Sequence, residues 1–242
     1  YETAVRLAHK LGGGSALVAA PPIDIVMTLE GNTDGKAKTY EWLNKKGMQK
    51  YTLQRYTTSG KDVNYSLVRY PVVVKPILGG GGRNVYVAQN TRELSKIRKY
   101  MRHERIIIEE AINSRREWAL HFAAYRGNMT GTTCIRFDFA DQFGIRKTKT
   151  TQPVNVTNAE SCPLPVVEAA KLFVQASTYH GVGCLSGKFK GPQFKLLDIN
   201  PRVCNMASRY NQGRFMRTFL RLMQRESTRV QTKKKQCVQS PK

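Results

Sequence analysis

Apolar residues fall into short runs along the chain, and these alternate with turn-forming stretches and with segments of helical periodicity. Segments 63–75 and 84–88 are rich in β-branched residues, which predicts two strands joined by a glycine-rich tip. The apolar run in 105–112 predicts a buried strand. Residues 117–126 and 130–139 predict a hairpin that turns at the sequence RGN.

Helical periodicity marks two segments in the first half of the chain. Residues 36–46 predict a helix that ends just before Gly47, because glycine readily adopts the left-handed conformation of a helix end. Residues 90–103 predict a second helix, with Asn90 or Thr91 as its N-cap.

The second half of the chain continues the mixture of element types. The segment 164–181 predicts an amphipathic helix that ends at Gly181. Two strands at 183–190 and 193–199 and a last helix from about residue 211 complete the pattern. The fold class predicted from this order is α/β (α+β), arranged in two lobes.

The charge of the chain adds a class of ligand to this picture. The 242 residues include 40 Lys+Arg and 17 Asp+Glu, a formal net charge of +23, which attracts polyanions such as nucleotides, nucleic acid or anionic membranes. After residue 209, arginines recur at helical spacing and a lysine-rich tail follows. This basic C-terminal helix and tail predicts weak polyanion binding, and a solvated face with a frayed tail is the alternative.

Five cysteines, at positions 134, 162, 184, 204 and 237, show no CxxC pairing. We interpret them as reduced intracellular thiols and not as a disulfide framework or a zinc site. No apolar run approaches the roughly 20 residues of a membrane span, and no segment has the pattern of a signal peptide. The sequence therefore predicts a cytoplasmic protein without a membrane span.

The first candidate site is the stretch PVVVKPILGGGGRNVYV at residues 71–87. Glycines at a hairpin tip let backbone N–H groups approach an anion without hindrance from a Cβ atom. Lys75, in the preceding strand, can direct a positive charge to the same place. The pattern predicts a phosphate-binding loop, and a flexible turn beside a lysine that reaches solvent is the alternative. The loop glycines are Gly79, Gly80, Gly81 and Gly82.

The second candidate site follows the isoleucine-rich strand. Glu109 and Glu110 lie where this strand ends, and the backbone from there to Ile112 offers hydrogen-bonding groups beside an apolar wall. Such groups can bind an adenine edge as another strand would, and Glu117 could bind ribose hydroxyls. Two exposed acids that balance the nearby arginines are the alternative interpretation.

The third candidate site is the sequence QFKLLDINPR at residues 193–202. Asp198 and Asn200 are two positions apart, so a strand places both on one face. Two hard oxygen donors beside bound phosphates suit Mg²⁺. Arg202 could pair with a phosphoryl or carboxylate group. The alternative is a strand that simply ends at polar residues before a proline.

Taken in order, these motifs resemble the ATP-grasp family, over roughly residues 34–220. The resemblance begins at DGKAKTYEWLNKKGM and continues through YPVVVKPILGGGGRNVYVAQNTREL and IIIEEAI. It ends at FKLLDINPR, which is similar to the family's E-x-N-P-R and also to the ending found in carbamoyl-phosphate synthase and biotin carboxylase. The resemblance implies the ATP-grasp fold, in which two α+β lobes clasp a nucleotide.

The resemblance also implies a role for each matching residue. Lys36 and Lys75 would contact the phosphates of ATP beneath the glycine loop. The segment from Glu109 to Ile112 would hold the adenine edge, and Glu117 would hold the ribose.

The same resemblance implies a metal site and an activity. Asp198 and Asn200 would bind Mg²⁺, or alternatively Mn²⁺, and Arg202 would act in catalysis at the acyl phosphate. Lys147 or Lys149 would add a phosphate contact. The activity implied is that of an ATP-dependent ligase, which activates a small carboxylate as an acyl phosphate for attack by an amine.

The same resemblance suggests a division of the chain into four segments. Residues 1–35 are expected to be a linker or the remnant of a preceding domain. Residues 36–108 would form the small lobe with the glycine-rich loop, and residues 109–226 the large lobe with the metal site. Residues 227–242 would form a basic, disordered tail.

One departure from the family pattern bears on activity. Where the family carries an acidic metal ligand on the strand before E-x-N, this chain has Lys188, and the glutamate of E-x-N is shortened to Asp198. A charged lysine cannot bind Mg²⁺. The alternatives are therefore a catalytically impaired nucleotide-binding module, a carbamoyl-phosphate synthase-like domain, and a basic nucleic-acid-binding protein.

Overall fold

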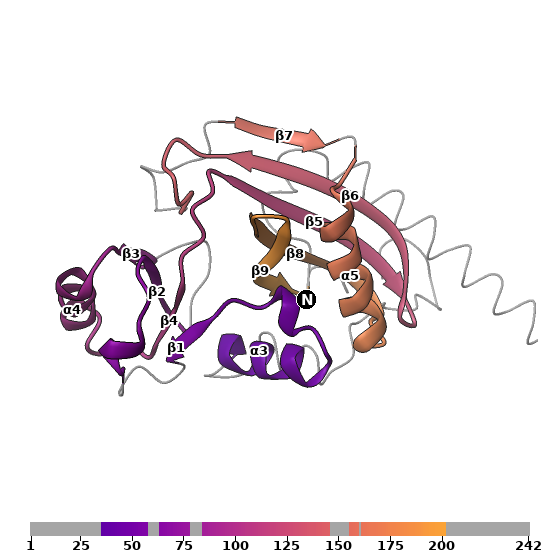
Figure 1. Cartoon of the computed structure of the whole chain (residues 1–242). Helices are drawn as coiled ribbons and strands as arrows, with labels where there is room; N and C mark the ends of the chain where they lie inside the picture. Colours follow the sequence, from indigo (N-terminus) through magenta and orange to yellow (C-terminus); the bar gives the residue numbers. More distant parts are fainter. Residues whose placement is uncertain (1–34, 58–62, 78–83, 146–154, 160, 202–242) are drawn as a thin grey trace, which may run out of the picture.

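Two antiparallel sheets and the helices packed on them make up the described part of the chain (Figure 1). The computed structural model describes residues 35–57, 63–77, 84–145, 155–159 and 161–201. The mixture of helices and sheets agrees with the predicted α+β class. Among the described residues, no helix is both long and apolar enough to cross a membrane.

The four-stranded sheet has the order β1-β4-β2-β3, with every neighbouring pair antiparallel. Its elements are β1 (Arg55–Thr57), β2 (Val72–Pro76), β3 (Tyr86–Ala88), helix α4 (Thr91–Tyr100) and β4 (Ile106–Glu110). Val72 and Val74 on β2 pack with Ile106 and Ile108 on β4 and with Leu94 of α4. Because side chains alternate along a strand, the residues between them point to the opposite face of the sheet.

The five-stranded sheet has the order β7-β6-β5-β8-β9 and is also antiparallel. Its elements are β5 (Arg116–Tyr125), β6 (Asn128–Asp138), β7 (Asn155–Ala159), helix α5 (Leu164–Ala176), β8 (Gly181–Lys190) and β9 (Gln193–Asn200). Helix α5 covers one face of this sheet, where Phe173 packs against Phe122 and Leu185 (Figure 1). The opposite face carries a smaller cluster around Ile135 and Phe137.

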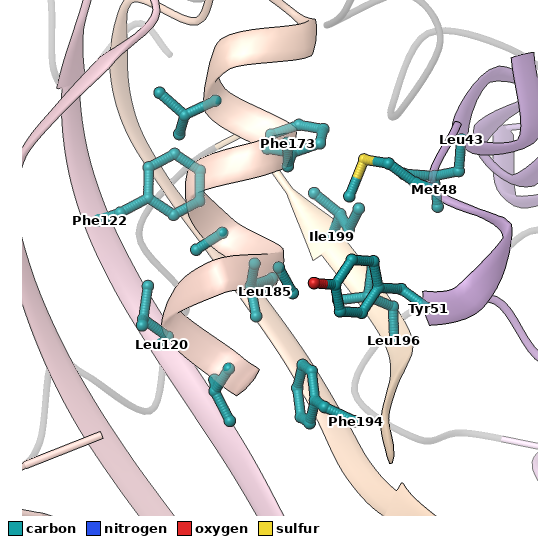
Figure 2. Packing of buried hydrophobic residues seen from close by; sticks show 14 of the residues in the cluster. Leu43, Met48, Tyr51, Leu120, Phe122, Phe173, Leu185, Phe194, Leu196 and Ile199 are labelled. Carbon is teal, nitrogen blue, oxygen red and sulfur yellow. The ribbon is translucent and has the colours of Figure 1, made fainter. Parts of the chain in front are cut away.

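Helix α3 (Gly35–Lys45) and the short helix η1 (Gln49–Tyr51) pack on the same core as α5. Figure 2 shows Leu43, Met48 and Tyr51 facing Leu196 and Ile199 of β9. Both helices precede the four-stranded sheet in the chain, but their apolar side chains pack in the core of the five-stranded sheet. The lobe boundaries after residues 35, 108 and 226 remain predictions.

Two predicted helix boundaries are confirmed. Helix α3 ends at Lys45, and Gly47 follows with a φ of +73°. Helix α4 uses Asn90 as its N-cap, whose side chain accepts a hydrogen bond of 3.0 Å from the backbone N–H of Glu93.

Two other boundaries were predicted wrongly. The strand predicted over 63–75 is only β2, because Asn64 caps a short 3₁₀ helix at Tyr65–Leu67 and Pro71 has no N–H to donate to a sheet. The helix predicted to end at Gly181 ends at Ala176. Thr178, with a φ of +48°, turns the chain there, and Gly181 begins β8.

The prediction of reduced thiols is wrong for Cys134, Cys162 and Cys184, each of which is disulfide-bonded. Cys134 on β6 and Cys162, just before α5, form a disulfide with their Cα atoms 5.4 Å apart. They are 28 residues apart in the chain, so the sequence gives no sign that the fold brings them together. The cysteines therefore no longer support a cytoplasmic location, which remains a prediction.

Candidate functional site

Residues from both sheets and from α3 line one cavity. Helix α3 and the part of the chain around the four-stranded sheet contribute Lys36, Val73, Lys75, Val85, Glu109, Glu110 and Ile112. The five-stranded sheet and the turn after β6 contribute Glu117, Phe143, Gly144, Ile145, Ser186, Lys188, Leu197 and Asp198. Within the described ranges, all the individual residues predicted to contact the nucleotide therefore line this cavity. They are Lys36, Lys75, Glu109, Glu110, Ile112 and Glu117.

Strand alternation explains why these residues meet. On β2 and β4, the valines and isoleucines that pack on α4 leave Lys75 and Glu109 on the cavity face. On the five-stranded sheet, α5 covers one face, and Ser186 and Asp198 pair in register on the other. The cavity thus lies where the polar faces of two half-buried sheets approach each other.

The Glu109 carboxylate is the centre of a buried ion cluster. One of its oxygens pairs with the ammonium of Lys75, and the other lies 3.9 Å from Arg55 Nε. The side chains of Lys75 and Glu109 are only 9% and 2% exposed. Burial alone would lower the pKa of Lys75, but the charge and hydrogen bond of Glu109, together with Tyr40, raise that pKa above its ordinary value. Lys75 is therefore held as a fixed positive charge on the cavity wall.

Tyr40 of α3 joins this cluster to the five-stranded sheet. Its ring lies beneath the Arg55 guanidinium, whose central carbon is 3.1 Å from the ring centroid. Its hydroxyl donates a 3.3 Å hydrogen bond to the carbonyl of Leu196 on β9. Tyr40 thereby ties both sheets together next to the cavity.

Lys36, in the first turn of α3, brings a second cation to the same wall. Its ammonium donates a 3.4 Å hydrogen bond to the carbonyl of Pro76. Burial and then the charge of Lys75 lower the pKa of Lys36, while Asp198 and Glu109 raise it in part. Two ammonium groups that repel each other in a partly buried place form a natural receptor for a multivalent anion.

The remaining predicted nucleotide residues have distinct surroundings. Glu110 pairs with Lys190 and accepts a 3.2 Å hydrogen bond from the backbone N–H of Gln54. Ile112 and Glu117 are both buried, each at 7% exposure, and line the cavity beside the exit of β4.

Asp198 and Asn200 lie together at the end of β9. The amide of Asn200 donates a 3.0 Å hydrogen bond to a carboxylate oxygen of Asp198, and Asp198 is exposed to the cavity. Asn200 lies beside Asp198 but outside the cavity lining. An accessible carboxylate with an amide beside it fits a single hard cation. Among the described residues, no group of three His, Cys, Asp or Glu side chains is placed to bind a metal ion.

Several predicted residues lie outside the described part of the chain. These are Gly79, Gly80, Gly81 and Gly82 of the glycine loop, Lys147, Lys149 and Arg202. The predicted basic helix and tail after residue 209 also lie there. Their roles remain predictions.

Some residues of the site were not predicted from the sequence. Val73 and Ser186 could have been found, because each is two positions from a residue already singled out on the same strand, namely Lys75 and Lys188. Arg55 gives no such signal, because it lies on a strand of three residues with no motif around it.

Comparison with known proteins places this geometry in a family. A family model described as an ATP-grasp domain matches residues 33–205, which is most of the chain. A search of curated proteins gives no match.

Solved structures show the same fold. Biotin carboxylase from Campylobacter jejuni, in a complex described as β,γ-ATP, superposes with a TM-score of 0.60 at 17% identity, covering 78% of this chain and 44% of that one. D-alanine–D-alanine ligase from Bacillus anthracis gives a TM-score of 0.59 at 15% identity, covering 89% and 72%. L-amino acid ligase from Bacillus licheniformis gives 0.55 at 17% identity, covering 75% and 43%. The chain thus spans less than half the length of the first and third of these proteins.

Proposed function

Because the chain belongs to the ATP-grasp domain family, we propose that it binds ATP in the cavity between its two sheets and uses it to activate a carboxylate for attack by an amine. The observation that carries this proposal is the convergence of Lys36 and Lys75 with Asp198 on one cavity. Two cations and an accessible carboxylate meet there, beside the end of an apolar strand.

In the proposed complex, the ammonium groups of Lys36 and Lys75 contact the triphosphate. The backbone from Glu109 to Ile112 holds the adenine edge through groups other than the N–H groups of Glu110 and Ala111, which already donate to carbonyl oxygens of Gln54 and Pro71. Glu117 holds the ribose. We also propose that the glycine loop covers the phosphates and that Arg202 acts at the acyl phosphate. These contacts supply the positioning and charge stabilisation on which phosphoryl transfer depends.

Asp198, supported by Asn200, would hold the divalent cation that the family implies. Its accessible carboxylate fits one hard cation, Mg²⁺ or Mn²⁺. When bound, such an ion neutralises phosphate charge.

The proposed reaction has two steps. The γ-phosphoryl group moves from ATP to a carboxylate oxygen of the substrate, giving ADP and an acyl phosphate. The amine nitrogen then attacks the acyl carbon, and inorganic phosphate leaves as the new carbon–nitrogen bond forms and the nitrogen loses a proton.

A second candidate is a module that binds ATP without turnover. It is favoured by Lys188, which the resemblance to the family aligns with an acidic metal ligand. Lys188 lies on the cavity wall, and its ammonium donates to backbone carbonyl oxygens. This candidate shares the binding site and differs only in chemistry.

Phosphate release separates the two candidates. With ATP and Mg²⁺, a panel of amino acids as carboxylate and amine substrates should include a combination that releases phosphate well above the rate with ATP alone. The wild-type chain without amino acids is the matched background. Release that stays at background with every combination, while ATP still binds, would reject the ligase in favour of the binding module.

A further inference from the structure

Lys188 is a buried cation in the wall of the cavity. It lies on β8 and is only 3% exposed. Its ammonium donates hydrogen bonds to three backbone carbonyl oxygens, those of Ser114 at 3.2 Å, Gly144 at 3.3 Å and Phe143. An ammonium has three N–H donors, so these three acceptors match its capacity. The side chain is therefore fastened to the protein backbone.

The three carbonyls belong to two segments that Lys188 draws together. Ser114 precedes β5, whereas Phe143 and Gly144 belong to the turn 139–145 after β6. Asp141 shapes this turn, because its carboxylate accepts hydrogen bonds of 2.9 and 2.7 Å from the backbone N–H groups of Phe143 and Gly144. Phe143, Gly144 and Ile145 of this turn form part of the cavity wall.

The packing around Gly144 shows how closely the turn fits Lys188. Gly144 has a φ of +51°, and a Cβ atom there would lie 2.7 Å from the Phe139 ring and 2.9 Å from Lys188 Nζ. The Phe139 ring centroid is 5.7 Å from the same ammonium. A Cβ atom at Gly144 would force the Phe139 ring or the lysine to shift, so the backbone of the turn packs directly against the ammonium.

This arrangement leaves no place for a second divalent cation beside Lys188 in the cavity. The three carbonyl oxygens around the ammonium already accept hydrogen bonds from it. A metal ion next to the ammonium would be repelled by its charge. Asp198 lies on the neighbouring strand, where the register pairs it with Ser186, two positions before Lys188 on β8. Its carboxylate remains accessible to a cation.

We propose that Lys188 is a positioning residue that fastens the turn 139–145 as a wall of the nucleotide cavity, and that its charge takes the place of a second divalent cation. The inference rests on the proposed binding of ATP. It assigns the lysine a defined task and limits the bound nucleotide to one divalent cation.

The first test counts metal ions. Mn²⁺ is titrated into wild-type protein saturated with a non-hydrolysable ATP analogue, and free Mn²⁺ is followed by electron paramagnetic resonance. The proposal predicts one Mn²⁺ per bound nucleotide, and two per nucleotide would overturn it. Failure of the analogue to bind at all would overturn the proposed function itself and this inference with it.

The second test uses Lys188→Met, which keeps the length of the side chain and removes the three donors. We expect the affinity for the analogue to fall about tenfold or more, because the wall loses hydrogen bonds from a charged group. Lys171→Met, the same change on an exposed position of α5, should leave the affinity unchanged. A Lys188→Met protein that folds and binds the analogue as the wild type does would refute the positioning role. If Lys188→Met does not fold, the Mn²⁺ count on wild-type protein decides.

A third variant tests whether a second metal site can be gained. Lys188→Glu should bind two Mn²⁺ per nucleotide if it folds, because it replaces the ammonium by a carboxylate among carbonyl oxygens. A folded Lys188→Glu protein that still binds one Mn²⁺ would count against the proposal that the lysine charge excludes the second ion.

Discussion

Glu109→Gln should lower the free energy of unfolding by about 3–5 kcal/mol, the cost of removing one partner from a buried ion pair. The substitution keeps the shape of the side chain but leaves the ammonium of Lys75 without its carboxylate and Arg55 without the neighbouring charge. Burial lowers the pKa of Lys75, and the Glu109 carboxylate makes the largest contribution to reversing this effect. Urea unfolding followed by circular dichroism measures the change.

The neighbouring residue provides a matched control. Glu110→Gln makes the same chemical change one position along β4, where the partner, Lys190, is 57% exposed. Water screens the exposed lysine of this pair, and such pairs contribute about 0–1 kcal/mol, so this variant should lose much less stability than Glu109→Gln. Equal losses in the two variants would show that the buried cluster does not have the stabilising role assigned to it.

Lys36→Met should raise the Kd for ATP about 10- to 100-fold, because the triphosphate loses a charge-assisted hydrogen bond of about 1.5–3 kcal/mol. The same change should leave the free energy of unfolding unchanged or raise it. Burial and the charge of Lys75 lower the pKa of Lys36, so its positive charge opposes folding in the absence of a ligand. Calorimetric titration with ATP and urea unfolding give the two quantities.

Helix α3 itself supplies the control for this variant. Lys38 is exposed and does not line the cavity, so Lys38→Met removes the same charge two positions away. Its affinity for ATP should match that of the wild type. A similar loss of affinity in both variants would point to the general positive charge of the chain and not to the cavity.

Period-two alternation allowed much of the site to be predicted. Lys75 and Glu109 follow runs of valine and isoleucine, and strand geometry places them opposite the apolar core. Asp198 could be placed on one face of its strand in the same way. Local pattern therefore identifies which residues leave the core and at which end of a strand they lie.

Contacts between distant segments could not be predicted. The pairing of Lys75 with Glu109 depends on the register of β2 against β4, and the stacking of Arg55 on Tyr40 depends on how α3 packs. The three acceptors of Lys188 are separated from it by 74, 45 and 44 residues. The disulfide between Cys134 and Cys162 was missed for the same reason. Each of these features depends on tertiary packing, which carries no local sequence pattern.

Titration of the wild-type chain with ATP and Mg²⁺ in an isothermal calorimeter tests the central claim most directly. We expect saturable binding of one ATP per chain, with a Kd below about 1 mM, and a Kd about 10- to 100-fold higher in Lys36→Met. No saturable binding up to several times that concentration, by a chain that is folded, would contradict it.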